Sequence, residues 1–299
     1  MKALDAAFLR GSYPPLITPF RDGAVDVDAY AALVERQVAG GSHGITVNGT
    51  TAEPSTLTVE ERNLLVRAAV EVADGRVPVV AATGSQSHAE TVELTTFAAS
   101  AGADALLIVT PYYIRPPQRG LVEYYRDLAT RTELPLLVYH IPGRTAVDVP
   151  PATLEQIADA APTFVGLKHA VNDLGYVSEA RRRLGDELRV FVGLEELSLP
   201  MLAVGATGLM NAVANVLPSD VAALYESVAS GDLTAARKQH DWLLELNQAV
   251  FWDTNPIPIK YAMKRMGVLP TNEHRLPMVP ATPELERRID DLLARMGLA

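Results

Sequence analysis

Short apolar segments alternate with amphipathic segments of helical length from residue 12 to about residue 230. Each apolar segment is bounded by glycine, proline or polar residues, which is typical of a buried strand. We therefore predict strands at 15–18, 44–48, 77–82, 105–110, 136–139, 163–168, 189–193 and 208–211. The amphipathic segments predict helices at 28–39, 58–73, 88–101, 119–131, 152–160, 173–184, 195–204 and 219–229.

This alternation amounts to eight strand–helix units. Strands that are apolar throughout are typical of a parallel sheet covered by helices, and a count of eight favours a closed barrel over an open sheet. No G-x-G-x-x-G motif follows the first strand, which argues against a dinucleotide-binding fold. We therefore predict an α/β fold, a TIM (β/α)8 barrel over residues 1–230.

Residues 231–299 continue with helical patterns at 233–251, 256–266 and 283–297. These helices contain too few residues to form a hydrophobic core of their own. We therefore predict a C-terminal helical domain over 231–299 that packs on the barrel or against a neighbouring subunit.

Charge and composition limit the binding partners and the kinds of reactive site that this chain can have. The chain has 299 residues and a formal net charge of −10, which disfavours nucleic acid and anionic membranes as partners. It contains no cysteine, which removes disulfides, thiolate metal ligands and cysteine nucleophiles together. No apolar run approaches the ~18 residues that a membrane span needs, and no signal peptide is recognisable at the start. We expect a cytoplasmic protein.

The strand predicted at 163–168 ends in Lys168, one of only five lysines in the chain. A lysine at the point where a strand leaves the core is partly desolvated, and a desolvated amine can lose its proton near pH 7. A neutral amine attacks a carbonyl carbon to form a Schiff base. The alternative is a lysine whose ammonium reaches out of the strand end to pair with a carboxylate.

Side chains with hydroxyl groups follow other predicted strands, at the end of a barrel where catalytic groups gather. Thr50 and Thr51 could bind a small carboxylate together with free backbone N–H groups, or could bond only within their own turn. Tyr113 follows the fourth strand and Tyr139 ends the fifth. With Thr50 they could form a proton relay to Lys168, although each tyrosine could equally be a core or interface residue.

Arg144 lies among turn residues after the fifth strand. Its planar guanidinium could hold the carboxylate of an incoming substrate, or could pair with Glu53 or Asp148. The six histidines are scattered and show no H-x-x-x-H spacing, so a metal-dependent aldolase has little support.

Several segments, taken in chain order, resemble the dihydrodipicolinate synthase / N-acetylneuraminate lyase family of pyruvate-dependent class I aldolases. The segments are Gly49-Thr50-Thr51-x-Glu53, Thr110-Pro111-Tyr112-Tyr113-x-Arg115-Pro116, Tyr139-x-Ile141-Pro142-x-Arg144-Thr145, Gly166-Leu167-Lys168, Asn255-Pro256-Ile257-Pro258-x-Lys260 and Arg275-Leu276-Pro277-Met278. Each is weak alone, but together they cover nearly the whole chain at family spacing and are highly specific.

The resemblance implies a TIM barrel with a C-terminal helical domain, usually assembled as a homotetramer. It implies that Lys168 forms a Schiff base with pyruvate and that Tyr139 is the proton shuttle. Thr50 and Tyr113 would complete the relay, with Tyr113 typically donated across a subunit interface. We expect no cofactor and no metal.

The resemblance also implies how substrates are held. Thr50 and Thr51 would bind the pyruvate carboxylate, and Gly193 and Met210 match positions that line the pyruvate pocket. In the synthase branch an arginine at the position of Arg144 receives the carboxylate of an aldehyde acid such as aspartate semialdehyde, whereas the neuraminate lyases lack it. A semialdehyde that bears a carboxylate is therefore the expected second substrate.

The chain also departs from the synthase pattern. The segments 193–202 and 249–256 look more like a 2,4-dihydroxyhept-2-ene-1,7-dioate aldolase, which would release pyruvate and succinate semialdehyde. Positions that resemble the lysine pocket of feedback-inhibited synthases carry Val59, Arg62 and Gln86, which argues against lysine inhibition. We predict a dihydrodipicolinate synthase-like lyase, with the dioate aldolase and a catalytically silent ligand-binding barrel as alternatives.

Overall fold

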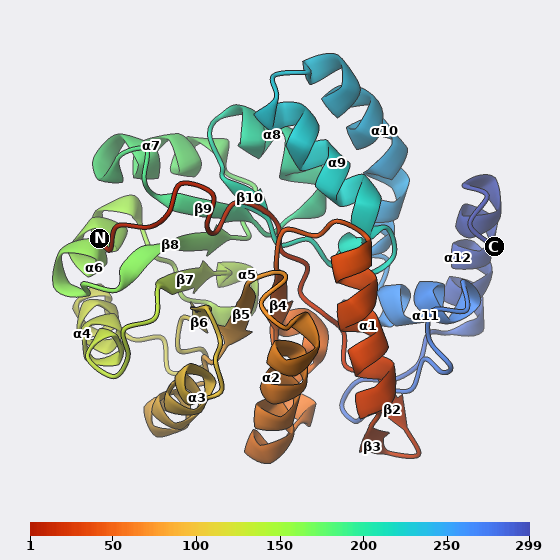
Figure 1. Cartoon of the computed structure of the whole chain (residues 1–299), viewed down its shortest axis with the longest axis horizontal. Coiled ribbons are helices and arrows are strands. Elements are labelled where there is room, and N and C mark those ends of the chain that lie inside the picture. The colour runs from red at the N-terminus through yellow and green to blue at the C-terminus, as the bar shows by residue number, and fades with distance from the viewer.

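The computed structural model describes all 299 residues, and a parallel eight-stranded sheet lies at its centre (Figure 1). The hydrogen-bonded order of the strands is β1-β10-β9-β8-β7-β6-β5-β4. Their bounds are β1 (Gly11–Ser12), β4 (Ile45–Val47), β5 (Val79–Ala82), β6 (Ala105–Val109), β7 (Leu136–His140), β8 (Phe164–His169), β9 (Arg189–Val192) and β10 (Gly208–Leu209). A parallel bridge from Pro15 to Thr46 joins the chain after β1 to β4 and closes the sheet. The predicted TIM barrel is confirmed.

Helices cover the outside of this barrel (Figure 1). They are α1 (Val27–Ala39), α2 (Val59–Ala73), α3 (His88–Ser100), α4 (Gln118–Ala129), α6 (Pro151–Ala160), α7 (Leu174–Leu184), α8 (Ser198–Ala203) and α9 (Pro218–Ala229). Shorter elements lie in the connections: the hairpin β2 (Phe20–Arg21) and β3 (Ala24–Val25), the 3₁₀ turns η1 (Thr50–Ala52), η2 (Pro54–Thr56), η3 (Glu195–Leu197) and η4 (Ala212–Asn215), and the helix α5 (Pro142–Thr145).

The first strand differs from the segment 15–18 that the pattern predicts. It lies earlier, at Gly11–Ser12, and only Pro15 adds a further bridge. Pro14 and Pro15 carry no N–H group, so this part of the chain cannot donate hydrogen bonds to a strand ladder. The other strands agree with their predicted segments to within two residues at each end.

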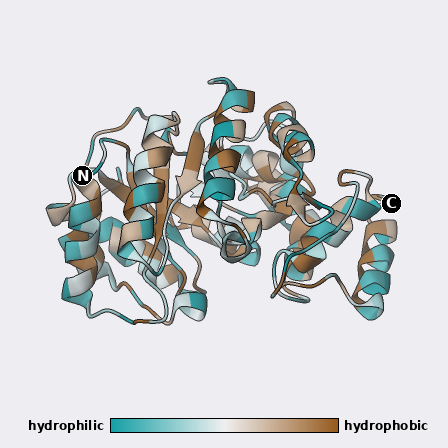
Figure 2. Cartoon of the chain, turned by 90° about the horizontal axis from the view of Figure 1, so that it is seen from below, coloured by the Kyte–Doolittle hydropathy of each residue, from teal (hydrophilic) through white to brown (hydrophobic).

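The apolar side chains form two clusters, one inside the barrel and one between the barrel and its helices. The inner cluster has 12 buried residues, among them Val80, Leu107, Leu137 and Val165. The outer cluster has 65 buried residues and extends into the C-terminal helices. Successive strand residues point to opposite faces, so a barrel that is apolar on both faces needs strands that are apolar throughout, as their brown colour in Figure 2 shows.

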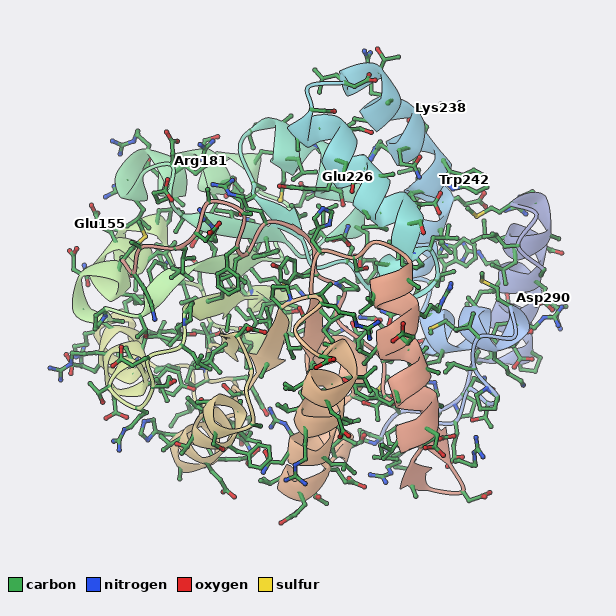
Figure 3. The ribbon with its side chains drawn as sticks, viewed as in Figure 1. Glu155, Arg181, Glu226, Lys238, Trp242 and Asp290 are labelled. Atoms are coloured by element: carbon green, nitrogen blue, oxygen red, sulfur yellow. The ribbon has the colours of Figure 1, made fainter.

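Three helices follow the barrel, α10 (Leu233–Ala249), α11 (Ile257–Arg265) and α12 (Pro283–Arg295). Trp242 on α10 donates its indole N–H to Asp220 on α9, with 2.9 Å between the two atoms. Asp290 on α12 accepts a hydrogen bond from the Tyr261 hydroxyl and pairs with Arg265, both on α11 (Figure 3). These helices therefore pack on the barrel and on one another. No helix in the structure has the length and apolar character required to cross a bilayer.

We expect Gly166→Ala to destabilise the protein strongly. Gly166 lies in β8, and a Cβ atom at this position would sit 1.9 Å from the carbonyl oxygen of Arg189 in β9. Two paired strands cannot separate locally without losing their hydrogen bonds, so we expect a loss of about 3 kcal/mol or more in the free energy of unfolding, measured by guanidinium denaturation. Gly143→Ala, where the added Cβ meets no atom within 4 Å, is the control. Equal stability of both variants would contradict this close strand approach.

Candidate active site

Strands β7 and β8 and the turn after β4 bring three of the predicted reactive side chains together. Tyr139 and Lys168 are direct neighbours in the register of β7 and β8. Both are buried, at 5% and 4% exposure. The hydroxyl of Thr50, in η1, lies 3.2 Å from the Tyr139 hydroxyl. The group lies at the carboxyl ends of the strands, where TIM barrels carry their active sites.

Lys168 is buried without an acidic partner. Its Nζ faces the ring of Tyr139, 4.5 Å from the ring centroid. Among the lysines, only Lys260 forms an ion pair, with Glu53. The alternative of an outward lysine that pairs with a carboxylate is therefore not observed. The nitrogen is thus free of a direct ion pair, while the buried carboxyl of Glu195 is close enough for Lys168 to oppose the rise that burial causes in its pKa.

Gly193 lies against the lysine stem, and Met210 lies in the core of the barrel. A Cβ atom on Gly193 would lie 2.8 Å from Lys168 Cε, so only glycine leaves room for the lysine in this position. Met210 is 1% exposed and belongs to the same inner apolar cluster as Tyr139. The role of Gly193 and Met210 as walls of a pyruvate pocket stays a prediction.

The two threonines use their hydroxyls outside their own turn. Thr50 bonds to Tyr139, and the Thr51 hydroxyl accepts a hydrogen bond from Asn255 Nδ2 at 3.0 Å. Bonding within the turn alone, the alternative for both residues, is not observed. The turn therefore connects the Tyr139 hydroxyl on one side to the C-terminal segment on the other.

Tyr113 does not join this group within one chain. It lies in the loop between β6 and α4, is 90% exposed, and has a φ of 70°. Its neighbour Ile114 is 72% exposed. The role of Tyr113 as a relay residue donated to another subunit stays a prediction.

A cavity of about 540 Å³ opens beside the Thr50–Tyr139 pair. Thr50, Tyr139 and Arg144 belong to its lining, together with Tyr112 and Asn255. Lys168 is not part of this lining, but its Nζ lies 4.5 Å from the centroid of the Tyr139 ring, which is part of it. The cavity has room for a small substrate next to the tyrosine hydroxyl.

Arg144 is exposed at the rim, in α5, and belongs to no ion pair or hydrogen bond through its side chain. The two acids that could have paired with it are engaged elsewhere. Glu53 binds Lys260 and His274, and Asp148 binds His140. The guanidinium is therefore available to a carboxylate that enters the cavity.

The sequence reasoning missed a buried histidine pair. His140 follows Tyr139 in β7, and His169 follows Lys168 in β8. His140 Nε2 is 2.7 Å from Asp148 Oδ1, and His140 Nδ1 is 3.1 Å from His169 Nδ1. Because the carboxylate accepts, His140 donates from Nε2 and accepts at Nδ1, so His169 donates from its own Nδ1. Tyr176 stacks on both rings. The signal was the position of each histidine directly after Tyr139 or Lys168, since neighbouring parallel strands pair such residues.

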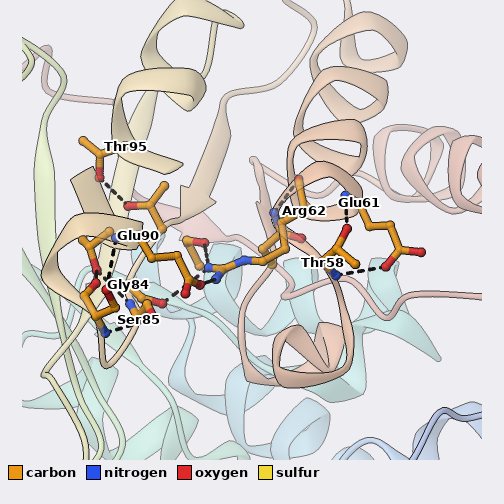
Figure 4. Close-up of polar contacts among 12 residues, drawn as sticks. Thr58, Glu61, Arg62, Gly84, Ser85, Glu90 and Thr95 are labelled. Atoms are coloured by element: carbon orange, nitrogen blue, oxygen red, sulfur yellow. Dashed lines mark hydrogen bonds and ion pairs between the residues drawn. The ribbon is translucent and has the colours of Figure 1, made fainter. Parts of the chain in front are cut away.

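Arg62 fixes the cavity wall on the side of α2 and β5 (Figure 4). It is 4% exposed, pairs with Glu90 at 3.1 Å, and donates to the carbonyl oxygens of Ala82 and Gly84. The side chain of Asn48 donates to the Arg62 carbonyl oxygen at 2.8 Å. Burial lowers the pKa of Arg62, while Glu90 opposes this shift. This arginine therefore links the ends of β4 and β5.

The comparisons with known proteins agree with this geometry. The model of the "Dihydrodipicolinate synthetase family" matches residues 8–296. The chain belongs to this family. The 4-hydroxy-tetrahydrodipicolinate synthase of Thermus thermophilus is 47% identical over 290 residues, which cover 97% of each protein. The fold of this chain matches the crystal structure of dihydrodipicolinate synthase from Aquifex aeolicus with a TM-score of 0.94 at 38% identity, and the match covers 97% of this chain and 98% of that one.

A third relative was solved with a bound ligand. The chloride-inhibited dihydrodipicolinate synthase from Acinetobacter baumannii, solved in complex with pyruvate, matches this chain with a TM-score of 0.94 at 34% identity. The match covers 97% of this chain and all of that one. The predicted family membership is confirmed, as is the predicted enzyme class, a pyruvate-dependent lyase of this family.

The histidine pair predicts a pH dependence of stability. Burial lowers the pKa of His169 from 6.5 to about 4, with His140 adding to the effect. Between these values the unfolded chain binds a proton that the folded chain excludes. The free energy of unfolding should therefore fall as the pH drops through this window, by up to about 3 kcal/mol for this residue. Above pH 6.5 this contribution should be constant.

His169→Asn should flatten this dependence, because the asparagine amide can still donate to His140 but does not titrate. The measurement is guanidinium denaturation of both proteins at pH steps from 4 to 7. The difference between the two curves removes the contribution of the carboxylates. Parallel curves would contradict the assignment of an excluded proton to His169.

Proposed function

We propose that this chain is a 4-hydroxy-tetrahydrodipicolinate synthase that condenses pyruvate with aspartate semialdehyde. The observation that carries the proposal is Lys168, buried without an ion pair against Tyr139, whose hydroxyl meets Thr50. The synthases that the chain resembles support this reaction over the dioate aldolase and over a catalytically silent barrel.

The first half of the proposed reaction joins pyruvate to the lysine. Thr50, Thr51 and backbone N–H groups of their turn bind the pyruvate carboxylate. The neutral amine of Lys168 attacks the keto carbon, and the former keto oxygen leaves as water after it receives a proton from the Tyr139 hydroxyl. The product is a protonated imine.

The second half forms the new carbon–carbon bond. The protonated imine withdraws electrons, so the pyruvate methyl group loses a proton to the Tyr139 oxygen, which gave up its own proton in the first half, and an enamine forms. The enamine carbon attacks the aldehyde carbon, and the resulting alkoxide takes up a proton through Tyr139 and Thr50. Arg144 holds the carboxylate of the semialdehyde during this step. The two substrate carboxylates are thus held by different groups. The amino group of the semialdehyde unit then attacks the imine carbon, which closes the ring of the product and releases Lys168 as a free amine.

We further propose that the enzyme acts in the cytoplasm as a homotetramer in which Tyr113 of one subunit completes the relay of another. The exposure of Tyr113 and Ile114, at 90% and 72%, supports an interface at this loop, since adjacent large apolar side chains are seldom left in water. With 90% exposure, the Tyr113 ring packs little against its own barrel and is accessible to another subunit.

Treatment with pyruvate and borohydride should leave a reduced pyruvate adduct on Lys168, detected by mass spectrometry of the peptides. Lys168→Ala should form no adduct and should lose turnover by about a thousandfold or more, because the amine is the nucleophile. Lys238→Ala, a change at an exposed lysine of α10, is the matched control and should keep both properties. Normal turnover of Lys168→Ala would exclude the proposed mechanism.

Arg144→Ala should raise the KM for the semialdehyde about 100-fold, because a charge-assisted contact to its carboxylate is lost. Imine formation with pyruvate should be unchanged. The measurement is a coupled assay with pyruvate and either aspartate or succinate semialdehyde, with Arg237→Ala on α10 as control. Turnover with succinate semialdehyde alone would favour the dioate aldolase, and loss of imine formation in Arg144→Ala would show that one group holds both carboxylates.

A further inference from the structure

A buried charged cluster lies immediately next to the turn that carries Thr50 and Thr51. Glu53 Oε1 accepts a hydrogen bond from Lys260 Nζ at 2.8 Å, and Glu53 Oε2 lies 2.8 Å from His274 Nδ1. The side chain of Glu53 is 1% exposed, and those of Lys260 and His274 are both 0% exposed. None of these three residues has a part in the reaction described above.

The cluster joins parts of the chain that are far apart in sequence. Lys260 and His274 lie 207 and 221 residues after Glu53. Lys260 belongs to α11, and its Nζ also donates to the carbonyl oxygen of Glu273 and faces the Phe20 ring. The C-terminal segment therefore reaches back to the barrel rim, and both Lys260 and His274 meet it at the carboxylate of Glu53.

The backbone at Glu53 needs such support. Glu53 has a φ of 56° and ψ of 45°, a left-handed conformation that costs free energy for a residue with a side chain. It ends η1 and begins η2, so its conformation sets the direction in which the Thr50–Ala52 turn enters the site. The contacts of Lys260 and His274 with its two carboxylate oxygens hold this residue in place.

Two further contacts hold the same turn. Asn255 Nδ2 donates to the Thr51 hydroxyl at 3.0 Å, and the Thr18 hydroxyl donates to the Ala52 carbonyl oxygen at 2.7 Å. Asn255 comes from the same C-terminal segment as Lys260. The turn is thus tied at its second threonine, at its last residue and at Glu53.

A buried ion pair is a poor device for stability alone. Desolvation of both charges offsets most of their attraction, and apolar residues of similar size often stabilise a core as well or better. Burial lowers the pKa of Lys260, and Glu53 opposes this shift. Directed, charge-assisted hydrogen bonds supply a fixed geometry, which apolar packing does not.

We propose that Glu53 is a positioning residue for the pyruvate half of the reaction: tied to Lys260 and His274, it holds the Thr50–Thr51 turn in the orientation that binds the pyruvate carboxylate. This inference rests on the proposed function. It assigns to the C-terminal segment a role in the geometry of the first substrate's site. Arg144, which holds the second substrate, lies in α5 and outside this cluster.

The test is Glu53→Gln, which keeps the shape of the side chain and removes its charge. Initial rates are measured with both substrates varied, and the adduct with pyruvate is trapped by borohydride at several pyruvate concentrations. The KM for pyruvate should rise about tenfold or more, and half-maximal trapping should shift to higher pyruvate by the same factor, since small displacements of a binding group are costly. The KM for the semialdehyde should stay within about twofold of its original value.

Two further variants keep the test decisive. Glu53→Gln combined with Lys260→Met removes the unpaired buried ammonium, so it should recover thermal stability but not the KM for pyruvate. Glu61→Gln is the matched control, because Glu61 forms an ion pair with Arg275 of the same C-terminal segment but does not touch the turn. This control should lose stability and keep the KM for pyruvate.

A wild-type KM for pyruvate in the double variant, or an equal rise in the KM values of both substrates, would overturn the inference and leave Glu53 with a role in stability only. Failure of the proposed function is a separate result. If the unaltered protein forms no trapped adduct with pyruvate, the reaction itself is wrong, whereas a normal adduct that is indifferent to Glu53→Gln refutes the positioning role alone.

Discussion

The proposed active site depends on one lysine that is buried at the end of a strand and forms no ion pair. Removing an ammonium from water is costly, and the usual compensation is a nearby carboxylate. Lys168 has instead the face of the Tyr139 ring and the space left by Gly193. An ion pair would hold the nitrogen as a cation and block its attack on a carbonyl carbon. An ion-paired lysine at this position would be more stable but unreactive, so the fold keeps the proposed nucleophile unpaired at a cost in stability.

The barrel can tolerate the cost of a buried, unpaired lysine because apolar packing in the rest of the fold stabilises it. Apolar side chains fill both its interior and the space under its helices, and the outer cluster continues without a break into the C-terminal helices. The polar and charged groups of the site lie only where the strands end. Since the strands are fixed by packing on both faces, side chains at their ends are held in place without needing the most stable local contacts.

The rim of the barrel is held by contacts from distant parts of the chain. Arg62 links the ends of β4 and β5, and the histidine pair joins the ends of β7 and β8. Glu53 connects the Thr50–Thr51 turn to the C-terminal segment. Each of these groups is buried and polar, and each binds backbone or side chains on a second element. The C-terminal helices therefore act on the geometry of the site as well as on the size of the core.

The sequence by itself determined the barrel and the place of its reactive residues. Segments that are apolar throughout and alternate with amphipathic helices have few folds open to them, and Tyr139 and Lys168 had to lie at strand ends. The tertiary structure alone decided which charges are paired. Glu53 and Asp148 could each have neutralised Arg144, yet they bind other partners and leave it free. Local patterns report which face of an element is buried, but an ion pair between residues some two hundred positions apart depends on how the whole chain closes.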